Sequence, residues 1–354
     1  MPIELVMLTA ASILSVGAMR TLPREVGPNA VVVLSWLTLA WLSWMSALWL
    51  LVGISAALAA MEIGDQTNRR TAAFIVSIAF HVGLLLVLSD QHALSLIGGA
   101  YFTLRHIHVL SDWWIHGRTR PSVVDYLRYQ LFLPVLAAGP IHRFEPFLRQ
   151  LRRRRNDPAE LAEGAERTLI GAFQFTVLSS YVLARGSREV EAVLSSWHAL
   201  PLEMLLSALD WISLYLAFAG LSSIAIGLSL MMGLRIEENF NRPWLARDLP
   251  DFWSRWHMSL TTFSQDYIFR PVSAVAGSAM IGVLAAMLFI GFWHGVSFYW
   301  AGWGVWQGTG ILLTLFARRL GLFAGWPIWT GRTFAASWLI GTAPVVSTLT
   351  GGFG

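Results

Sequence analysis

The run V-A-G-S-A-M-I-G-V-L-A-A-M-L-F-I-G-F-W, residues 275–293, contains no charged side chain. As a helix it would be about 28 Å long, close to the roughly 30 Å thickness of a bilayer's hydrocarbon core. Other apolar runs cover residues 3–19, 30–61, 71–88, 94–110, 125–138, 168–183, 203–233, 297–316 and 333–349. The sequence therefore predicts an all-α, polytopic membrane protein.

Two of these runs are too long for one crossing. Residues 30–61 would extend about 47 Å as a helix, so we expect two helices or one that is steeply tilted. We expect residues 203–233 to break near Gly220. The chain then has about ten to twelve transmembrane or re-entrant helices. No repeat or linker divides it, which predicts a single domain over residues 1–354.

The composition excludes several kinds of chemistry. The chain has 354 residues, of which 55% are hydrophobic and 13% charged, whereas soluble proteins carry roughly 25% charge. Without cysteine it has no disulfide, thiolate nucleophile or iron–sulfur site. Its 25 basic residues are all arginine, which excludes a Schiff-base or P-loop lysine. Arginine-rich cytoplasmic loops account for the basic pI, so we expect no nucleic-acid partner. Because Glu4 opens the first run, we expect it to be a retained helix.

Two segments are too polar for lipid. Residues 143–167 include four consecutive arginines, at 152–155, and are expected to form a solvated loop or surface helix that faces the cytoplasm. Residues 235–270 are rich in tryptophan and charge. There Asp248 is a candidate N-cap for a helix that reaches about Tyr267, with Asp251 in its first turn. Helical spacing would place five of its residues on one side of this helix: Trp253, Trp256, His257, Leu260 and Ser264.

Two histidines are the best acid–base candidates. Spacing alone favours an interfacial helix on which His257 is only a polar tip. His294 follows the uncharged run and precedes Gly295. It is either a helix-end histidine bonded to a carbonyl or a functional group that faces a cavity. Glycines at 291, 295, 302, 304, 308 and 310 would permit close approach of a helix or ligand. No metal-ligand spacing such as H-E-x-x-H occurs, so we expect no metal site.

Several strings occur in an order that resembles a known family. They are Y-F-T-L-R-H-I-H-V-L-S-D at 101–112, F-L-P-V-L-A-A-G-P-I-H-R-F at 132–144, N-F-N-R-P-W at 239–244, D-F-W-S-R-W-H-M-S-L at 251–260, D-Y-I-F at 266–269 and F-W-H-G at 292–295. Together they resemble the membrane-bound O-acyltransferase (MBOAT) family over about residues 94–310. The similarity is to its bacterial branch, which contains alginate O-acetyltransferase and the D-alanyl-lipoteichoic acid transfer protein.

The resemblance implies a bundle of helices around a central funnel. It also implies that His294 is the catalytic histidine and His257 the second one. The same motifs mark further residues as substrate-binding or site-lining: Asn241, Arg255, Trp256, Asp266, Tyr267 and Trp293. The chain departs from the family where residues 215–223 read Y-L-A-F-A-G-L-S-S, since both usual acidic positions are replaced, and at Gln265, where an arginine is usual.

The leading hypothesis is O-acyl transfer with His294 as general base. We expect no bound cofactor. The donor is a thioester on CoA or on an acyl carrier protein, and the acyl group is small, such as acetyl or D-alanyl. The acceptor is a hydroxyl on an exported polymer, a lipid or a downstream acyltransferase protein. The expected location is a bacterial cell (inner) membrane. The alternatives are a transporter or export-complex subunit, and a catalytically silent relative.

Overall fold

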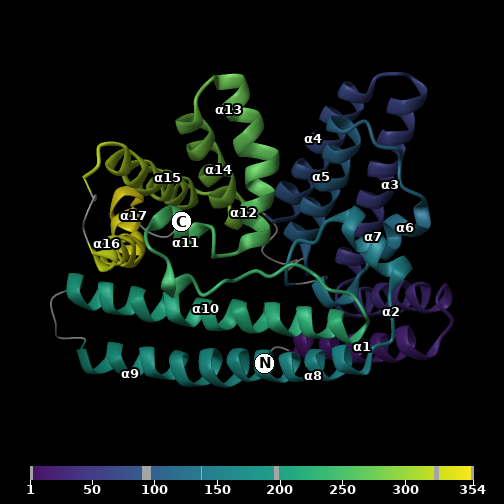
Figure 1. Ribbon diagram of the computed structural model, residues 1–354, viewed down its shortest axis with the longest axis horizontal. Coiled ribbons are helices and arrows are strands. Elements are labelled where there is room, and N and C mark those ends of the chain that lie inside the picture. Colours follow the sequence, from purple (N-terminus) through teal and green to yellow (C-terminus); the bar gives the residue numbers. More distant parts are fainter. Residues whose placement is uncertain (1–2, 90–96, 137, 195–198, 323–326, 352–354) are drawn as a thin grey trace. The chain divides into compact units, whose positions relative to one another are not determined.

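The computed structural model describes residues 3–89, 97–136, 138–194, 199–322 and 327–351. Within these ranges every regular element is a helix (Figure 1). The prediction of an all-α protein is confirmed. The chain divides into two compact units, one of residues 1–172 and 221–237 and the other of residues 173–220 and 238–354. The single domain and the funnel stay predictions.

The first unit contains most of the N-terminal helices. They are α1 Ile3–Thr21, α2 Val26–Leu42, α3 Trp44–Gln66, α4 Arg70–Ser89, α5 Gly99–Ile115, α6 Val123–Gln130, α7 Phe144–Arg153 and nearly all of α8 Pro158–Phe173. A 3₁₀ turn covers Leu133–Val135. The buried core of this unit includes Leu50, Met61 and Phe102.

Ser43 separates α2 from α3. It leaves the helical conformation, with φ −158°, and its hydroxyl accepts a hydrogen bond of 3.2 Å from the backbone N–H of Ser46. Such a cap satisfies an N–H group that has no partner within the helix. Residues 30–61 are therefore two helices, the first of the two predicted alternatives.

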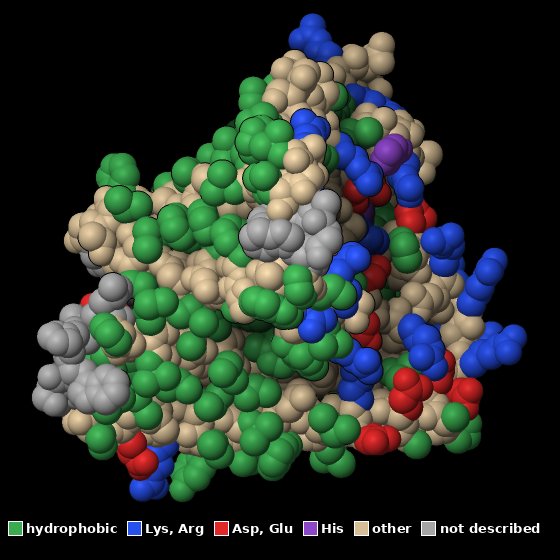
Figure 2. Space-filling model, turned by 60° about the vertical axis from the view of Figure 1, so that its left-hand side comes forward, with side chains coloured by type: hydrophobic (Ala, Val, Ile, Leu, Met, Phe, Trp, Pro, Cys, Tyr) green, Lys and Arg blue, Asp and Glu red, His purple; other side chains and the backbone are tan. Residues whose placement is uncertain are grey.

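Several helices are apolar enough to lie in lipid. Among the described residues, three can cross a membrane by length and composition, namely Glu4–Thr21, Trp44–Gln66 and Pro201–Met231. Shorter apolar helices are Val26–Leu42, Arg70–Leu86 and Ala279–His294. Hydrophobic side chains spread over much of the face drawn in Figure 2, as lipid contact requires. The total of ten to twelve spans stays a prediction.

Three helix predictions are wrong in detail. Residues 125–138 are not one helix, because α6 ends at Gln130 and Pro134 follows in the 3₁₀ turn, where it cannot donate a helical hydrogen bond. The helix α10, Ala199–Met231, does not break at Gly220, since one glycine costs only about 1 kcal/mol in a helix. The helix that leads to His294 begins at Ala279 rather than near Val275, because Gly277 adopts φ +62° and ends the preceding helix.

The arginine-rich segment 143–167 lies on the surface of the first unit. α7 buries one apolar face through Phe144, Phe147, Leu148 and Leu151, which makes it the surface helix that was one of the expected forms. One of the four consecutive arginines in this segment is not solvated. Arg154 is only 6% exposed and donates a 2.8 Å hydrogen bond to the carbonyl of Arg24.

The second unit contains the remaining helices. They are α9 Ala184–Leu194, α10 as far as Gly220, α11 Leu249–Trp253, α12 Met258–Ser264, α13 Arg270–Ala276, α14 Ala279–His294, α15 Phe298–Arg319, α16 Ile328–Ile340 and α17 Thr342–Thr350. π-Helical segments cover Gln174–Leu183 and Gln265–Phe269, and a 3₁₀ turn covers Pro243–Leu245.

Glycines bring α14 and α15 together. A Cβ atom at Gly291 would lie 2.3 Å from the carbonyl oxygen of Trp300, and one at Gly304 would lie 2.7 Å from that of Met287. Either contact is shorter than real Cβ atoms show. The expectation that these glycines permit close helix approach is confirmed.

Candidate functional site

The tryptophan-rich segment begins as the sequence predicts. The carboxylate of Asp248 caps α11 by accepting a 3.1 Å hydrogen bond from the backbone N–H of Asp251. The helix does not continue to Tyr267, however. α11 ends at Trp253, and α12 starts again at Met258. The single amphipathic helix expected from the spacing is therefore wrong.

His257 occupies the break between these helices. Its backbone is left-handed, with φ +42° and ψ 53°, a conformation that non-glycine residues adopt uncommonly. Asn239 holds the next turn from both sides, since its carbonyl accepts from Met258 N–H at 2.9 Å and its side-chain oxygen accepts from the Ser259 hydroxyl at 2.6 Å. The fold therefore fixes the direction in which His257 leaves the chain.

The imidazole of His257 is buried among aromatic rings. The residue is 4% exposed, and its ring centroid lies 4.6 Å from that of Phe218 and 5.5 Å from that of Trp293. Its Nε2 has no hydrogen-bond partner among the described residues. A buried nitrogen without a partner costs free energy unless something binds to it, so this atom is available to a substrate or to another ionisable group.

His294 is the last residue of α14 and is more accessible than His257. Its ring stacks on that of Trp300 at 4.7 Å with an interplanar angle of 17°, and it meets the ring of Trp293 at 4.8 Å. Gly295 makes room for this stack, because a Cβ there would lie 2.7 Å from Cδ1 of Trp300. Trp293 thus contacts both histidines, although they lie 37 positions apart in the sequence.

Both histidines line one cavity of about 310 Å³ in the second unit. Its wall contains seven aromatic side chains, those of Trp211, Phe218, Trp253, Trp256, Tyr299, Trp300 and Trp303. Polar groups reach it from Ser207, Asp210, Thr261 and Thr342. A mostly apolar cavity with a few convergent polar groups is the usual form of a small-molecule site.

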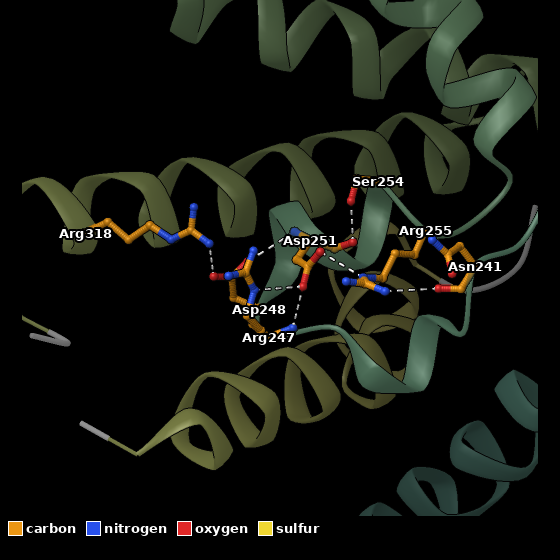
Figure 3. Close-up of polar contacts among 7 residues, drawn as sticks. All are labelled: Asn241, Arg247, Asp248, Asp251, Ser254, Arg255 and Arg318. Carbon is orange, nitrogen blue, oxygen red and sulfur yellow. Dashed lines mark hydrogen bonds and ion pairs between the residues drawn. The ribbon is translucent and has the colours of Figure 1, made fainter. Parts of the chain in front are cut away.

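A network of charged side chains stabilises the turn between α11 and α12 (Figure 3). The carboxylate of Asp251 accepts from the backbone N–H and Nε of Arg247, at 2.9 and 3.2 Å, and from Nε of Arg255 at 2.8 Å. Partial burial raises the pKa of Asp251, but the hydrogen bonds from Arg247 and Arg255 outweigh it and hold that pKa below its usual value. Asp248 also pairs with Arg318 of α15. The network ties α11 to α15.

The sequence candidates fall into two groups. His257, His294 and Trp256 line the cavity, and Trp293 contacts both imidazoles. The other four lie outside the set of lining residues. The backbone N–H of Asn241 donates to the carbonyl of Arg255, and the guanidinium of Arg255 donates to the carbonyl of Asn241. Asp266 pairs with Arg270 at 2.8 Å, and Tyr267 packs on Phe263. These four support the turn or its flanking helix, and their role in substrate binding stays a prediction.

Sequence reasoning missed Asp210. Its signal was present, because it is an acidic residue within the apolar span Pro201–Met231, and ionisable residues at such depth often serve function.

Four of the other histidines belong to the first unit's interior. His106 meets the hydroxyl of Tyr126 at 2.6 Å, and Phe144 N–H donates to Nε2 of His108 at 3.0 Å. The motif strings at 101–112 and 132–144 therefore form part of the core of the first unit. Within the described residues no group of three or more potential ligands could hold a metal ion.

Comparison with known proteins gives a consistent assignment. The family model described as MBOAT, membrane-bound O-acyltransferase family, matches residues 32–323. The probable alginate O-acetylase AlgI of Pseudomonas aeruginosa is 30% identical over 245 residues, which is 66% of this chain and 44% of the relative. The same-named protein of Azotobacter vinelandii is 32% identical over 224 residues, which is 62% of this chain and 44% of the relative.

A second kind of relative is similar to nearly the same extent. The teichoic acid D-alanyltransferase of Streptococcus thermophilus is 27% identical over 242 residues, which is 63% of this chain and 57% of the relative. The chain spans about half the length of the curated relatives it matches.

Proposed function

This chain belongs to the membrane-bound O-acyltransferase family, and from that premise we propose that it moves a small acyl group from a thioester to a hydroxyl. One observation carries the proposal. Two histidines from separate elements face one aromatic cavity, at the end of an apolar helix, within the region that matches the family. That is where a membrane enzyme needs a proton acceptor, because water is scarce there.

In the proposed reaction, His294 is the general base. Its neutral imidazole takes the proton of the acceptor hydroxyl while that oxygen attacks the thioester carbonyl carbon. A C–O ester bond forms, the C–S bond breaks, and the departing thiolate takes up the proton that the imidazolium returns. General-base help of this kind is worth about 10²–10⁴-fold. The aromatic wall would limit hydrolysis by keeping water from the acyl group.

His257 acts in support of that step. Its Nε2 has no hydrogen-bond partner among the described residues, and its ring contacts Trp293, which also contacts the more accessible His294. A buried imidazole in this position orients a substrate group by accepting or donating one hydrogen bond. Its loss should therefore weaken transfer without abolishing it.

The donor and acceptor follow from chemistry and from the relatives. The donor is an acyl-CoA or an acyl carrier protein thioester, and no other cofactor is needed. The named relatives acetylate alginate or D-alanylate teichoic acid, so the acyl group here is acetyl or similar to D-alanyl. The acceptor hydroxyl belongs to a cell-envelope or exported polymer, a lipid or a downstream acyltransferase protein. The protein works in a bacterial inner membrane.

Turnover by purified protein tests the proposal. The protein in detergent is mixed with acyl-CoA thioesters and a panel of hydroxyl acceptors, and ester product and released thiol are measured together. Thiol release matched by ester formation is expected. The protein is also placed in sealed vesicles. If it forms no ester in any condition but carries the acceptor into the vesicles, it is a transporter. A folded protein that does neither would be a silent relative.

A further inference from the structure

One side of α10 forms a wall of the cavity that holds both histidines. The residues that line it are Ser207, Asp210, Trp211, Leu214 and Phe218. Their spacing of three, one, three and four residues keeps them on one helical side. Phe218 contacts the ring of His257, and Asp210 lies eight residues earlier, about 12 Å along the helix axis.

Asp210 is the one acidic side chain among the described lining residues. It lines the cavity and is exposed, and no described residue pairs with it through a hydrogen bond or an ion pair. It lies within an apolar span, where a charge without a partner costs free energy. The described part of the lining offers no arginine to neutralise it. A partner from outside the chain would remove that cost.

The aromatic wall favours a cation as that partner. Seven of the seventeen described lining residues are tryptophan, tyrosine or phenylalanine, and the faces of such rings attract ammonium groups. A carboxylate together with aromatic faces is the chemistry that recognises an ammonium ion. The same carboxylate would repel an anionic group placed directly beside it.

We propose that Asp210 is a specificity-determining residue that binds an ammonium group of the substrate. This rests on the proposed function, since it assigns a substrate class to the same cavity. The ammonium belongs either to an aminoacyl group on the donor or to an amino alcohol on the acceptor. In both cases it pairs with the Asp210 carboxylate while the reacting hydroxyl or carbonyl lies at His294.

A binding measurement tests the proposal without turnover. Tryptophan fluorescence of the purified protein is titrated with choline and with 3,3-dimethylbutan-1-ol, in which carbon replaces the charged nitrogen. We expect the wild type to prefer choline at least tenfold, and Asp210→Asn to lose that preference while still binding the neutral alcohol. Asp210→Glu should keep part of it. Glu203→Gln, which removes an exposed carboxylate of the same helix outside the cavity lining, is the matched control and should keep all of it.

Two results would overturn the proposal: a wild type that binds both probes equally, or an Asp210→Asn protein that keeps the preference. Equal loss of both probes would also overturn it, because Asp210 would then be structural. His294→Ala should keep the choline preference and lose transfer, so the two proposals fail separately. Transfer rates then identify whether the ammonium group belongs to the donor or to the acceptor. Alanyl-CoA is compared with isobutyryl-CoA as donor, and ethanolamine is compared with 1-propanol as acceptor.

Discussion

The ring of His294 has Trp300 stacked against it and belongs to the cavity wall. Its neighbour Gly295 has φ 171°, an extended conformation open to any residue, so space rather than backbone angle requires glycine there. A methyl group at this position would meet the indole of Trp300 at 2.7 Å. The stack that orients His294 would have to shift.

We therefore predict that Gly295→Ala slows acyl transfer roughly 10–100-fold, because misplacing a catalytic group by about 1 Å costs that much. Gly186→Ala is the control, since a Cβ at Gly186 within α9 meets nothing within 4 Å. That change should leave transfer unaltered and stabilise the helix by about 0.5–1 kcal/mol. Equal transfer rates for the two variants would show that the Trp300 stack does not matter.

At the same scale, the sequence predicted some site residues and not others. Both histidines, Trp256 and Trp293 could be found from the ordered motifs. Asp210 could not be assigned, because a single acid in an apolar helix does not reveal which neighbour it faces. The left-handed backbone of His257 could not be predicted either. The apolar residues on the two sides of the short break keep helical spacing, so the sequence reads as one continuous helix.

Among the elements, the turn between α11 and α12 depends on Asp251. Its carboxylate is 10% exposed and accepts three hydrogen bonds from two arginines. We predict that Asp251→Asn lowers the free energy of unfolding by about 1.5–3 kcal/mol at neutral pH, the usual worth of hydrogen bonds to a charged group. Glu189→Gln, which breaks an exposed pair with Arg185, is the control and should leave the free energy of unfolding unchanged.

The pH dependence of this effect has a definite sign. The folded-state pKa of Asp251 is depressed, so its contribution is complete above the ordinary aspartate value of about 3.9 and is lost as pH falls through the lower folded value. Melting temperatures in detergent between pH 7 and pH 3 should therefore converge for wild type and Asp251→Asn. A gap that stayed constant would mean that the carboxylate is not the source of the stabilisation.

Helix positions followed from composition, but helix ends did not. Two helices over residues 30–61 were one of the two predicted alternatives, because a helix of 32 residues is longer than a bilayer is thick, but the position of the break at Ser43 was not predicted. The same reasoning failed for α10, which stays helical for 33 residues. Length limits what lipid can cover, yet it does not by itself break a helix.

On the scale of the whole molecule, the run of arginines predicts the orientation in the membrane. The absence of cysteine from the sequence makes the test clean. A cysteine at exposed Asn156, beside the arginine run, should resist an impermeant maleimide in intact cells and react after permeabilisation. Labelling in intact cells would reverse the assigned orientation. The unmodified protein is the control and should not label in either condition.

The central claim is that His294 performs the proton transfer, and its replacement tests this most directly. His294→Ala, His257→Ala and the exposed control His116→Ala are purified, checked for a single folded species, and assayed for ester formation from an acyl thioester. We predict a loss of about 10²–10⁴-fold for His294→Ala, a smaller loss for His257→Ala and none for His116→Ala. If His294→Ala turned over at a rate near that of the wild type, the proposed mechanism would be contradicted, whatever the other variants did.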